Sequence, residues 1–257
     1  MANSNPRLDR EDENTVLGRN AVIELLRGSR EVECVYICDE VPARGQPISR
    51  IVAMAKERGV PVKKVDAKKL DALSNGLPHQ GVAALAAAFS YSTVDGLFAR
   101  AGSEPPFFLV ADGIEDPHNL GAIIRTAEAA GAHGLILPKR GGVGLTPIVR
   151  RTRAGAVEHL PVARVTNLVR TLEELKKRGV WIYGAEAGGG RWEECDLTGP
   201  AALVIGSEGF GLSRLVRETC DVILSLPMLG KVNSLNASVA AGILMYEVVR
   251  QRTRAER

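Results

Sequence analysis

The chain has 257 residues, 45% of them hydrophobic and 25% charged, which is the balance of an ordinary globular protein. No apolar run approaches the roughly 18 residues of a membrane-spanning helix, and the polar N-terminus lacks the apolar stretch of a signal peptide. The net charge is only +3, so the composition does not mark a strongly basic nucleic-acid-binding domain. We expect a cytoplasmic protein whose residues 1–13 form a disordered leader.

The first ninety residues predict a small α/β unit. Apolar patterns predict strands over residues 32–38, 62–65 and 81–89 and helices over residues 20–26 and 48–58. A Pro pair and small polar residues follow in residues 91–106, which we interpret as a linker.

Four cysteines raise the question of a metal site. Cys34 and Cys38 lie in one apolar run, where a strand would point both side chains to the same face. No second Cys or His pair follows at the spacing of zinc ligands. Buried, reduced thiols in a cytosolic protein are therefore the better interpretation, and we expect no metal.

From residue 107 onwards, strands and helices alternate. Short apolar runs predict strands over residues 107–111, 135–138, 162–165, 181–183, 202–205 and 222–226. Helical spacing and capping residues predict helices over residues 119–130, 166–178, 212–220 and 234–251, with a further helix beginning at Thr146 and Pro147. This alternation is typical of an α/β fold with a mostly parallel sheet and helices on both faces.

Three loops of this second half carry polar residues that folding alone does not require. Each follows a predicted strand, and open α/β sheets bind ligands beyond the carboxyl ends of their strands. The first loop, residues 112–121, leads into a helix that carries Arg125. Asn119 in this loop is also a good helix N-cap, which is the simpler interpretation of that residue. Arg125 follows the apolar pair Ile123 and Ile124, an uncomfortable place for a purely solvated charge.

The second and third loops are rich in glycine and in amide and hydroxyl side chains. Three glycines and Glu208 lie in residues 206–211, where backbone N–H groups can approach a ligand closely. Glu208 has a simpler interpretation as a cap of the following helix, and the glycine spacing is not the dinucleotide-binding fingerprint. Residues 233–238 then place four amide or hydroxyl side chains at the start of the last helix, although one N-cap is enough.

Together the three segments resemble the three motifs of SpoU-type (TrmH-type) RNA 2′-O-methyltransferases in the SPOUT superfamily. The resemblance rests on Asn119 with Arg125, on Ile205-Gly206-Ser207-Glu208-Gly209, and on Asn233-Ser234-Leu235-Asn236-Ala237-Ser238-Val239-Ala240. Upstream, the segments that resemble the ribosomal-protein-like substrate domain of bacterial enzymes acting on 23S rRNA guanosine are Gly18-Arg19-Asn20-Ala21-Val22 and His79-Gln80-Gly81-Val82.

The resemblance implies a trefoil-knotted α/β domain over residues 107–257 that forms homodimers, and an RNA substrate-binding domain over residues 14–90. It implies S-adenosylmethionine as the methyl donor, bound in the knot around Gly206, Leu226 and Leu235. The implied reaction is methylation of a ribose 2′-hydroxyl, most closely in a guanosine of 23S rRNA, with tRNA or the antibiotic-resistance site of 23S rRNA as alternative targets. A non-catalytic RNA-binding protein of ribosome assembly and, from the glycine loop alone, a nicotinamide-dependent enzyme are the alternatives from other classes.

The same resemblance implies a catalytic set. Its members are Asn119, Arg125, Glu208, Ser234 and Asn236. A guanidinium, with a pKa above about 12, is a poor base, so we expect Arg125 to hold the RNA phosphate and stabilise the developing alkoxide while the proton leaves to a neighbouring oxygen or water. Ser234 and Asn236 would orient Arg125 and the ribose, and Glu208 would help to hold the motif loops or the substrate.

Positive charge is locally clustered although the net charge is small. Arg150, Arg151 and Arg153 form one cluster, and the C-terminal tail carries another. Residues 151–156 depart from a Lys-Ala-Ser-Ala-Gly-Ala-like stretch of the family, and the changes keep or add charge that would attract phosphate. Isolated clusters are more often solvated helix faces, so they become informative only if they flank a pocket.

Overall fold

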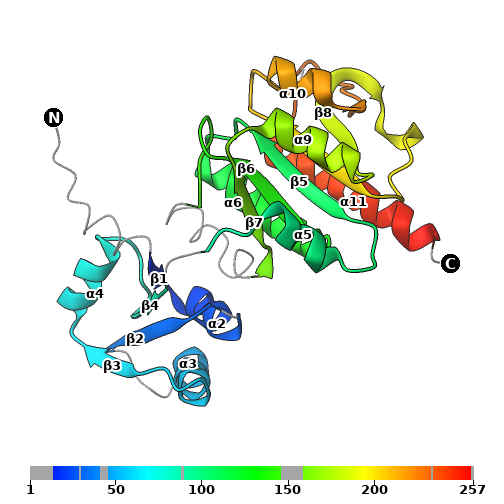
Figure 1. Ribbon diagram of the computed structural model, residues 1–257. Coiled ribbons are helices and arrows are strands. Elements are labelled where there is room, and N and C mark those ends of the chain that lie inside the picture. The colour runs from blue at the N-terminus through cyan, green and yellow to red at the C-terminus, as the bar shows by residue number, and fades with distance from the viewer. Residues whose placement is uncertain are drawn as a thin grey trace. The chain divides into compact units, whose positions relative to one another are not determined.

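The computed structural model describes residues 14–28, 30–40, 46–87, 90–145, 159–232 and 234–255, and it divides into two compact units (Figure 1). Among these residues, unit 1 comprises those up to Ser90 together with Leu145 and His159, and unit 2 comprises the rest. The predicted leader, the helix predicted from Thr146 and the arginine cluster at residues 150–153 lie outside the described residues.

Unit 1 contains a four-stranded mixed sheet in the order β1-β4-β2-β3. Its elements are β1 (Thr15–Leu17), α2 (Arg19–Arg27), β2 (Val32–Cys38), α3 (Gln46–Glu57), β3 (Val62–Val65), α4 (Ala67–Ser74) and β4 (Val82–Ala86). β4 pairs antiparallel with β1 and β2, and β3 pairs parallel with β2. The sequence pattern missed β1 and α4, because three and eight residues are too few for a clear period.

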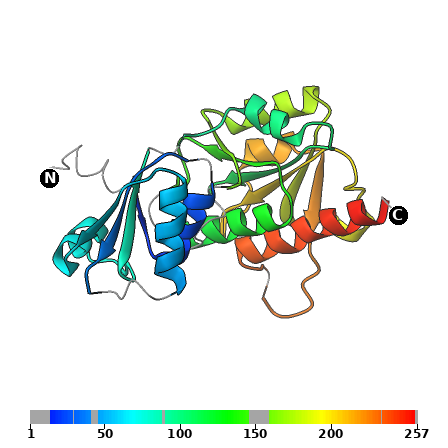
Figure 2. The same ribbon diagram turned by 90° about the horizontal axis from the view of Figure 1, so that it is seen from below.

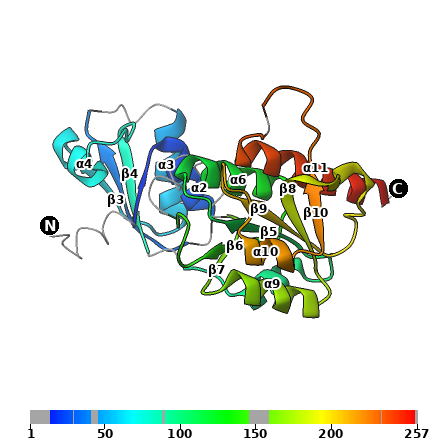
Figure 3. The same ribbon diagram turned by 90° about the horizontal axis from the view of Figure 1, so that it is seen from above.

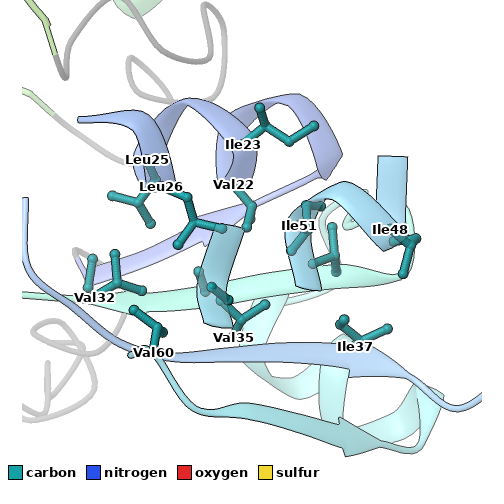
Figure 4. Close-up of a cluster of buried hydrophobic side chains, with 14 residues drawn as sticks. Val22, Ile23, Leu25, Leu26, Val32, Val35, Ile37, Ile48, Ile51 and Val60 are labelled. Carbon is teal, nitrogen blue, oxygen red and sulfur yellow. The ribbon is translucent and has the colours of Figure 1, made fainter. Parts of the chain in front are cut away.

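Helices α2 and α3 cover one face of this sheet. Val22 and Leu25 of α2 and Ile48 and Ile51 of α3 lie three residues apart along their helices, and all four pack into one cluster with Val35 of β2 (Figure 4). Successive side chains of a strand point to opposite faces of the sheet, so the alternate side chains of β2 pack in a second cluster together with residues of α4. Within that alternation Cys34 and Cys38 are buried free thiols, as the sequence predicted.

Unit 2 is built on six parallel strands in the order β10-β8-β9-β5-β6-β7. Its elements are α5 (Val94–Ala101), β5 (Phe107–Asp112), α6 (Pro117–Ala129), β6 (Gly134–Pro138), β7 (Val162–Val165), α9 (Leu168–Lys177), β8 (Trp181–Arg191), a 3-10 turn (Trp192–Glu194), β9 (Ala201–Gly206), α10 (Arg214–Thr219), β10 (Val222–Ser225) and α11 (Ala237–Ala255). The predicted α/β fold with a parallel sheet is confirmed.

The helices form layers on both faces of this sheet. α6 and α11 lie side by side on one face, and α5, α9 and α10 cover the other (Figures 2 and 3). The central strands β5 and β9 are therefore buried along their whole length, which explains their uninterrupted apolar sequences. None of the described helices is long and apolar enough to cross a membrane.

Residues 91–106, which the composition assigns to a linker, contain α5. Thr93 caps this helix by accepting a hydrogen bond from the backbone N–H of Gly96. Leu97 is fully buried and packs so closely on Gly134 of β6 that a Cβ at that glycine would lie 2.5 Å from the leucine side chain. The helix ends at Ala101 with Gly102 as its C-cap, and the Pro pair lies in the short connection to β5, so residues 91–106 include a helix that belongs to the core of unit 2.

Candidate functional site

A pocket of about 890 Å³ opens at the carboxyl ends of β8, β9 and β10. Its wall consists of those strand ends, the loop that follows β9 and the residues around the start of α11. Six of the eight residues that the sequence assigns to the site line this pocket: Gly206, Glu208, Leu226, Ser234, Leu235 and Asn236. The volume lies in the range that binds a small organic molecule.

The loop after β9 is closed by its own backbone. Ser207 and Gly211 exchange two backbone hydrogen bonds of 3.0 Å, and Gly209 and Gly211 have φ angles of 86° and 67°, which favour glycine. The closed loop folds back onto Gly206, where a Cβ would lie only 2.3 Å from the carbonyl carbon of Gly211. Glycine at position 206 is therefore required by the packing of the loop itself.

Asn236 joins the three sequence motifs. Its Nδ2 donates hydrogen bonds to Oδ1 of Asn119, at 2.9 Å, and to a carboxylate oxygen of Glu208. Its Oδ1 accepts hydrogen bonds from the backbone N–H groups of Ser238 and Val239, so the same side chain caps α11. Helix α11 consequently begins at Ala237, three residues after the predicted start.

Two simpler interpretations of the motif residues are wrong. Asp116, not Asn119, caps α6, by accepting a hydrogen bond from the backbone N–H of His118. Asn119 lies in the first turn of α6, where it is only 6% exposed and uses its amide oxygen for Asn236. Glu208 does not cap α10 either, because its carboxylate accepts the backbone N–H of Ala237 at the start of α11. A carboxylate at that position is stabilised by the dipole of the long helix.

Arg125 stands apart from the pocket wall. It is an exposed residue of α6, about 9 Å further along the helix axis than Asn119, and it does not line the pocket. The preceding residues Ile123 and Ile124 are fully buried. Within the part of the chain that the structure describes, Arg125 makes no hydrogen bond or ion pair, so its guanidinium is available to a ligand.

Sequence reasoning missed two charged residues of the wall. Glu186 and Arg217 line the pocket and form an ion pair through Oε2 and Nε. The sequence predicted a strand over residues 181–183, whereas β8 continues to Arg191 and carries Glu186 to the pocket. Gly211 makes room for this carboxylate, since a Cβ there would lie 2.8 Å from Oε1 of Glu186. The sequence feature that could have identified Glu186 is a carboxylate shortly after an apolar strand.

The wall combines apolar surface with charged side chains of both signs, among which Glu186 is paired with Arg217. Leu224, Leu226, Leu235 and Leu244 supply aliphatic contact area, and Glu186 and Glu208 supply carboxylates. The backbone of the closed glycine loop adds groups that can reach a ligand without a side chain in the way. The described residues contain no group of three or more His, Cys, Asp or Glu side chains that could hold a metal ion. This wall fits a ligand that has an apolar ring together with polar groups.

Two family models match the chain. Residues 106–246 match the SpoU rRNA Methylase family, and residues 15–92 match the RNA 2′-O ribose methyltransferase substrate binding family. Among curated proteins, the chain is 51% identical over 240 residues to YacO of Bacillus subtilis (strain 168), which is assigned to the TrmH family of tRNA/rRNA methyltransferases. That match covers 92% of this chain and 95% of YacO.

Solved structures show the same likeness. The fold is similar to that of the SpoU methyltransferase AviRb from Streptomyces viridochromogenes in complex with AdoMet, with a TM-score of 0.79, 28% identity and coverage of 98% of this chain and 95% of AviRb. It is also similar to an AdoMet-bound rRNA methyltransferase from Sinorhizobium meliloti, with a TM-score of 0.76, 26% identity and coverage of 94% and 89%. S-adenosylmethionine (AdoMet) is accordingly the expected cofactor. The motifs at the pocket, the matched families and these relatives together show that the chain belongs to the SpoU (TrmH) family of RNA methyltransferases.

Proposed function

We propose that this protein methylates a ribose 2′-hydroxyl of RNA, and that its target is a guanosine of 23S rRNA. The observation that carries the proposal is the junction at Asn236, which hydrogen-bonds Asn119 and Glu208 and so joins the first motif to the two motifs that line the pocket. The match of residues 15–92 to a substrate-binding family of RNA 2′-O ribose methyltransferases supports the ribose as the acceptor.

Gly206, Leu226 and Leu235 would hold the methyl donor, because all three line the pocket and two of them offer apolar surface to its adenine. When bound, the donor supplies an electrophilic methyl group on a positively charged sulfur. The protein then has to orient the acceptor and remove its proton, so positioning accounts for much of the expected rate.

The motif side chains divide these tasks. Both polar atoms of the Asn236 side chain are engaged within the protein, so its proposed role is to hold Asn119, Glu208 and the start of α11 in place. Ser234 lines the pocket and has no hydrogen-bond partner among the described residues, so its hydroxyl is available to orient the ribose. Glu208 holds the glycine loop against α11 through Oε1, and its exposed position leaves its second carboxylate oxygen, Oε2, accessible to a ligand.

Arg125 would bind the RNA phosphate and stabilise the developing alkoxide. Its exposed guanidinium is a planar fork suited to two phosphate oxygens. The proton of the hydroxyl would leave to a neighbouring oxygen or water, since a guanidinium stays protonated.

A homodimer belongs to the same proposal. Val239, Ile243 and Tyr246 of α11 are exposed and recur at helical spacing, which forms an apolar stripe suited to a second copy of the chain. We expect Ile243→Asp to convert a dimer to monomers in sedimentation experiments. Mixing Arg125→Ala with Asn236→Asp subunits would then show whether Arg125 serves its own pocket or that of the partner, because only the second arrangement restores one working site.

The finer features of the fold remain part of the proposal. The likeness to SpoU structures supports a trefoil knot within residues 107–257 and a ribosomal-protein-like substrate domain over residues 14–90. A cytoplasmic location follows from a ribosomal RNA target.

The decisive experiment maps 2′-O-methyl groups on the ribosomal and transfer RNA of cells with and without the protein. We expect one guanosine of 23S rRNA to lose its ribose methyl group in the cells without it, and purified protein with S-adenosylmethionine to restore that group in vitro. Loss of a methyl group in tRNA alone would favour the alternative substrate. Loss of a base methyl group would refute the 2′-hydroxyl as acceptor, and an unchanged map would favour a non-catalytic protein of ribosome assembly.

A further inference from the structure

Phe210 lines the pocket but is 92% exposed. Only Leu229 exposes a larger fraction, 97%, among the large hydrophobic residues that the structure describes. By contrast, Phe107 and Phe108 are fully buried, and Phe98 packs edge-on against Phe108 with ring centroids 5.0 Å apart. The fold thus buries the phenylalanines that stabilise it and leaves Phe210 in water, so folding does not account for this ring.

The backbone that carries Phe210 is held tightly. Gly209 and Gly211 flank it in left-handed conformations, and the two hydrogen bonds between Ser207 and Gly211 close the loop around it. The loop packs closely on Gly206, because a Cβ at that position would lie 2.3 Å from the carbonyl carbon of Gly211. A phenyl ring has only two side-chain torsions, so a rigid loop presents it outward with little entropy left to lose on binding.

We propose that Phe210 is a substrate-binding residue that stacks on an unpaired nucleobase of the RNA beside the ribose that accepts the methyl group. This rests on the proposed function. A ribose that enters the pocket carries its base to the rim, which is where the ring lies. Proteins bind unpaired bases by stacking them on aromatic side chains, and this contact tolerates any base because every base has a π-face.

Phe210 is less suited to an interface with another protein than to stacking on a base. The exposed apolar residues of α11 form a stripe at helical spacing, as an interface between helices requires. Phe210 instead stands alone between two glycines, with the carboxylate of Glu208 two residues away. A single flat ring with small neighbours fits one planar partner rather than an extended interface.

The test compares Phe210→Leu, which keeps an apolar side chain without a π-face, with Phe210→Trp, which keeps the face. The control is Trp181→Leu, because Trp181 is 55% exposed at the opposite end of β8 from the pocket. The full-length proteins are assayed with 23S rRNA transcribed in vitro. We expect Phe210→Leu to raise KM for the RNA roughly 10-fold or more, with kcat and the Kd for S-adenosylmethionine unchanged, and the other two variants to behave like the wild type.

Three results would overturn the inference. An unchanged KM for RNA in Phe210→Leu would mean that no base stacks there. If Phe210→Leu loses as much affinity for S-adenosylmethionine as for RNA, the ring contacts the methyl donor. If this variant changes the oligomeric state, the ring contacts a second copy of the chain. If the wild type methylates no RNA, the proposed function fails, but the stacking can still be tested by RNA binding. Equal filter-binding Kd values of the wild type and Phe210→Leu for the same transcript would then refute the stacking.

Discussion

Replacing Asn236 by aspartate tests the junction of the three motifs. The substitution preserves the shape of the side chain and the oxygen that caps α11, so the bonds from Ser238 and Val239 survive. It removes the amide NH2 group that donates hydrogen bonds to Asn119 and Glu208, and it sets a carboxylate against the carboxylate of Glu208.

The expected loss follows from these contacts. Two hydrogen bonds, each contributing about 1 kcal/mol net, are lost. Two like charges about 3 Å apart repel by roughly 1.4 kcal/mol even in the dielectric of water, which applies because Glu208 is exposed. We therefore expect Asn236→Asp to lower the free energy of unfolding by about 3 kcal/mol. Asn236→Ser, which keeps a capping oxygen and adds no charge, should cost about 2 kcal/mol.

Urea unfolding followed by tryptophan fluorescence measures this loss directly. The chain has two tryptophans, Trp181 and Trp192, and both lie in unit 2 with the site, so the signal reports that unit. Adding Glu208→Gln to Asn236→Asp removes the repulsion, and a double-mutant cycle should give a coupling of about 1 kcal/mol or more. In 1 M salt the difference between the Asp and Ser variants should shrink, because charges are screened over about 3 Å.

The reasoning would be refuted by an Asn236→Asp protein that unfolds within about 0.5 kcal/mol of the wild type, the spread of ordinary surface substitutions. A coupling near zero in the cycle would likewise show that Asn236 and Glu208 do not interact.

Three further predictions concern other parts of unit 2. Gly206→Ala should lower the free energy of unfolding by about 2 kcal/mol or more and abolish donor binding in calorimetry, because its Cβ would meet the backbone of Gly211 at 2.3 Å. Gly230→Ala is the matched control and should have neither effect, because nothing lies within 4 Å of a Cβ there. Burial raises the pKa of Tyr183 to about 12. The neutral phenol therefore stabilises the fold below pH 10, and this contribution, roughly 2–3 kcal/mol, is lost as the pH rises from 10 to 12. Urea midpoints should fall over that pH range in the wild type and much less in Tyr183→Phe. Arg125→Lys should leave the urea midpoint unchanged but lower the initial rate of methyl transfer at least about 10-fold, and near-full activity would contradict a role for the guanidinium fork.

Local patterns in the sequence identified most elements of the fold. The bounds of β2, β3 and β7 agree with the prediction, because each segment begins with a valine, a residue common in strands, and is followed at once by a polar residue. Helix α5 was missed because the Pro pair after it outweighed the weak signal of only eight residues, about two turns. Only the burial of Leu97 against Gly134 shows that this helix belongs to the core.

The start of α11 illustrates why boundaries escape sequence reasoning. Residues 234–238 contain several side chains that can cap a helix, and each is acceptable on local grounds. The structure selects Asn236, since that side chain alone also reaches Asn119 and Glu208. A contact with distant residues thus decides a local feature.

By itself, the sequence determined the family, the cofactor and the alternation of strands and helices, because these depend on residue types at fixed spacings along the chain. Only the tertiary structure decided which of the motif residues meet. It joined Asn236 to a residue 117 positions away, paired Glu186 with Arg217, and left Arg125 and Phe210 exposed to solvent. The physical reason is that side-chain contacts between remote segments depend on how the strands and helices pack, and no local period encodes that packing.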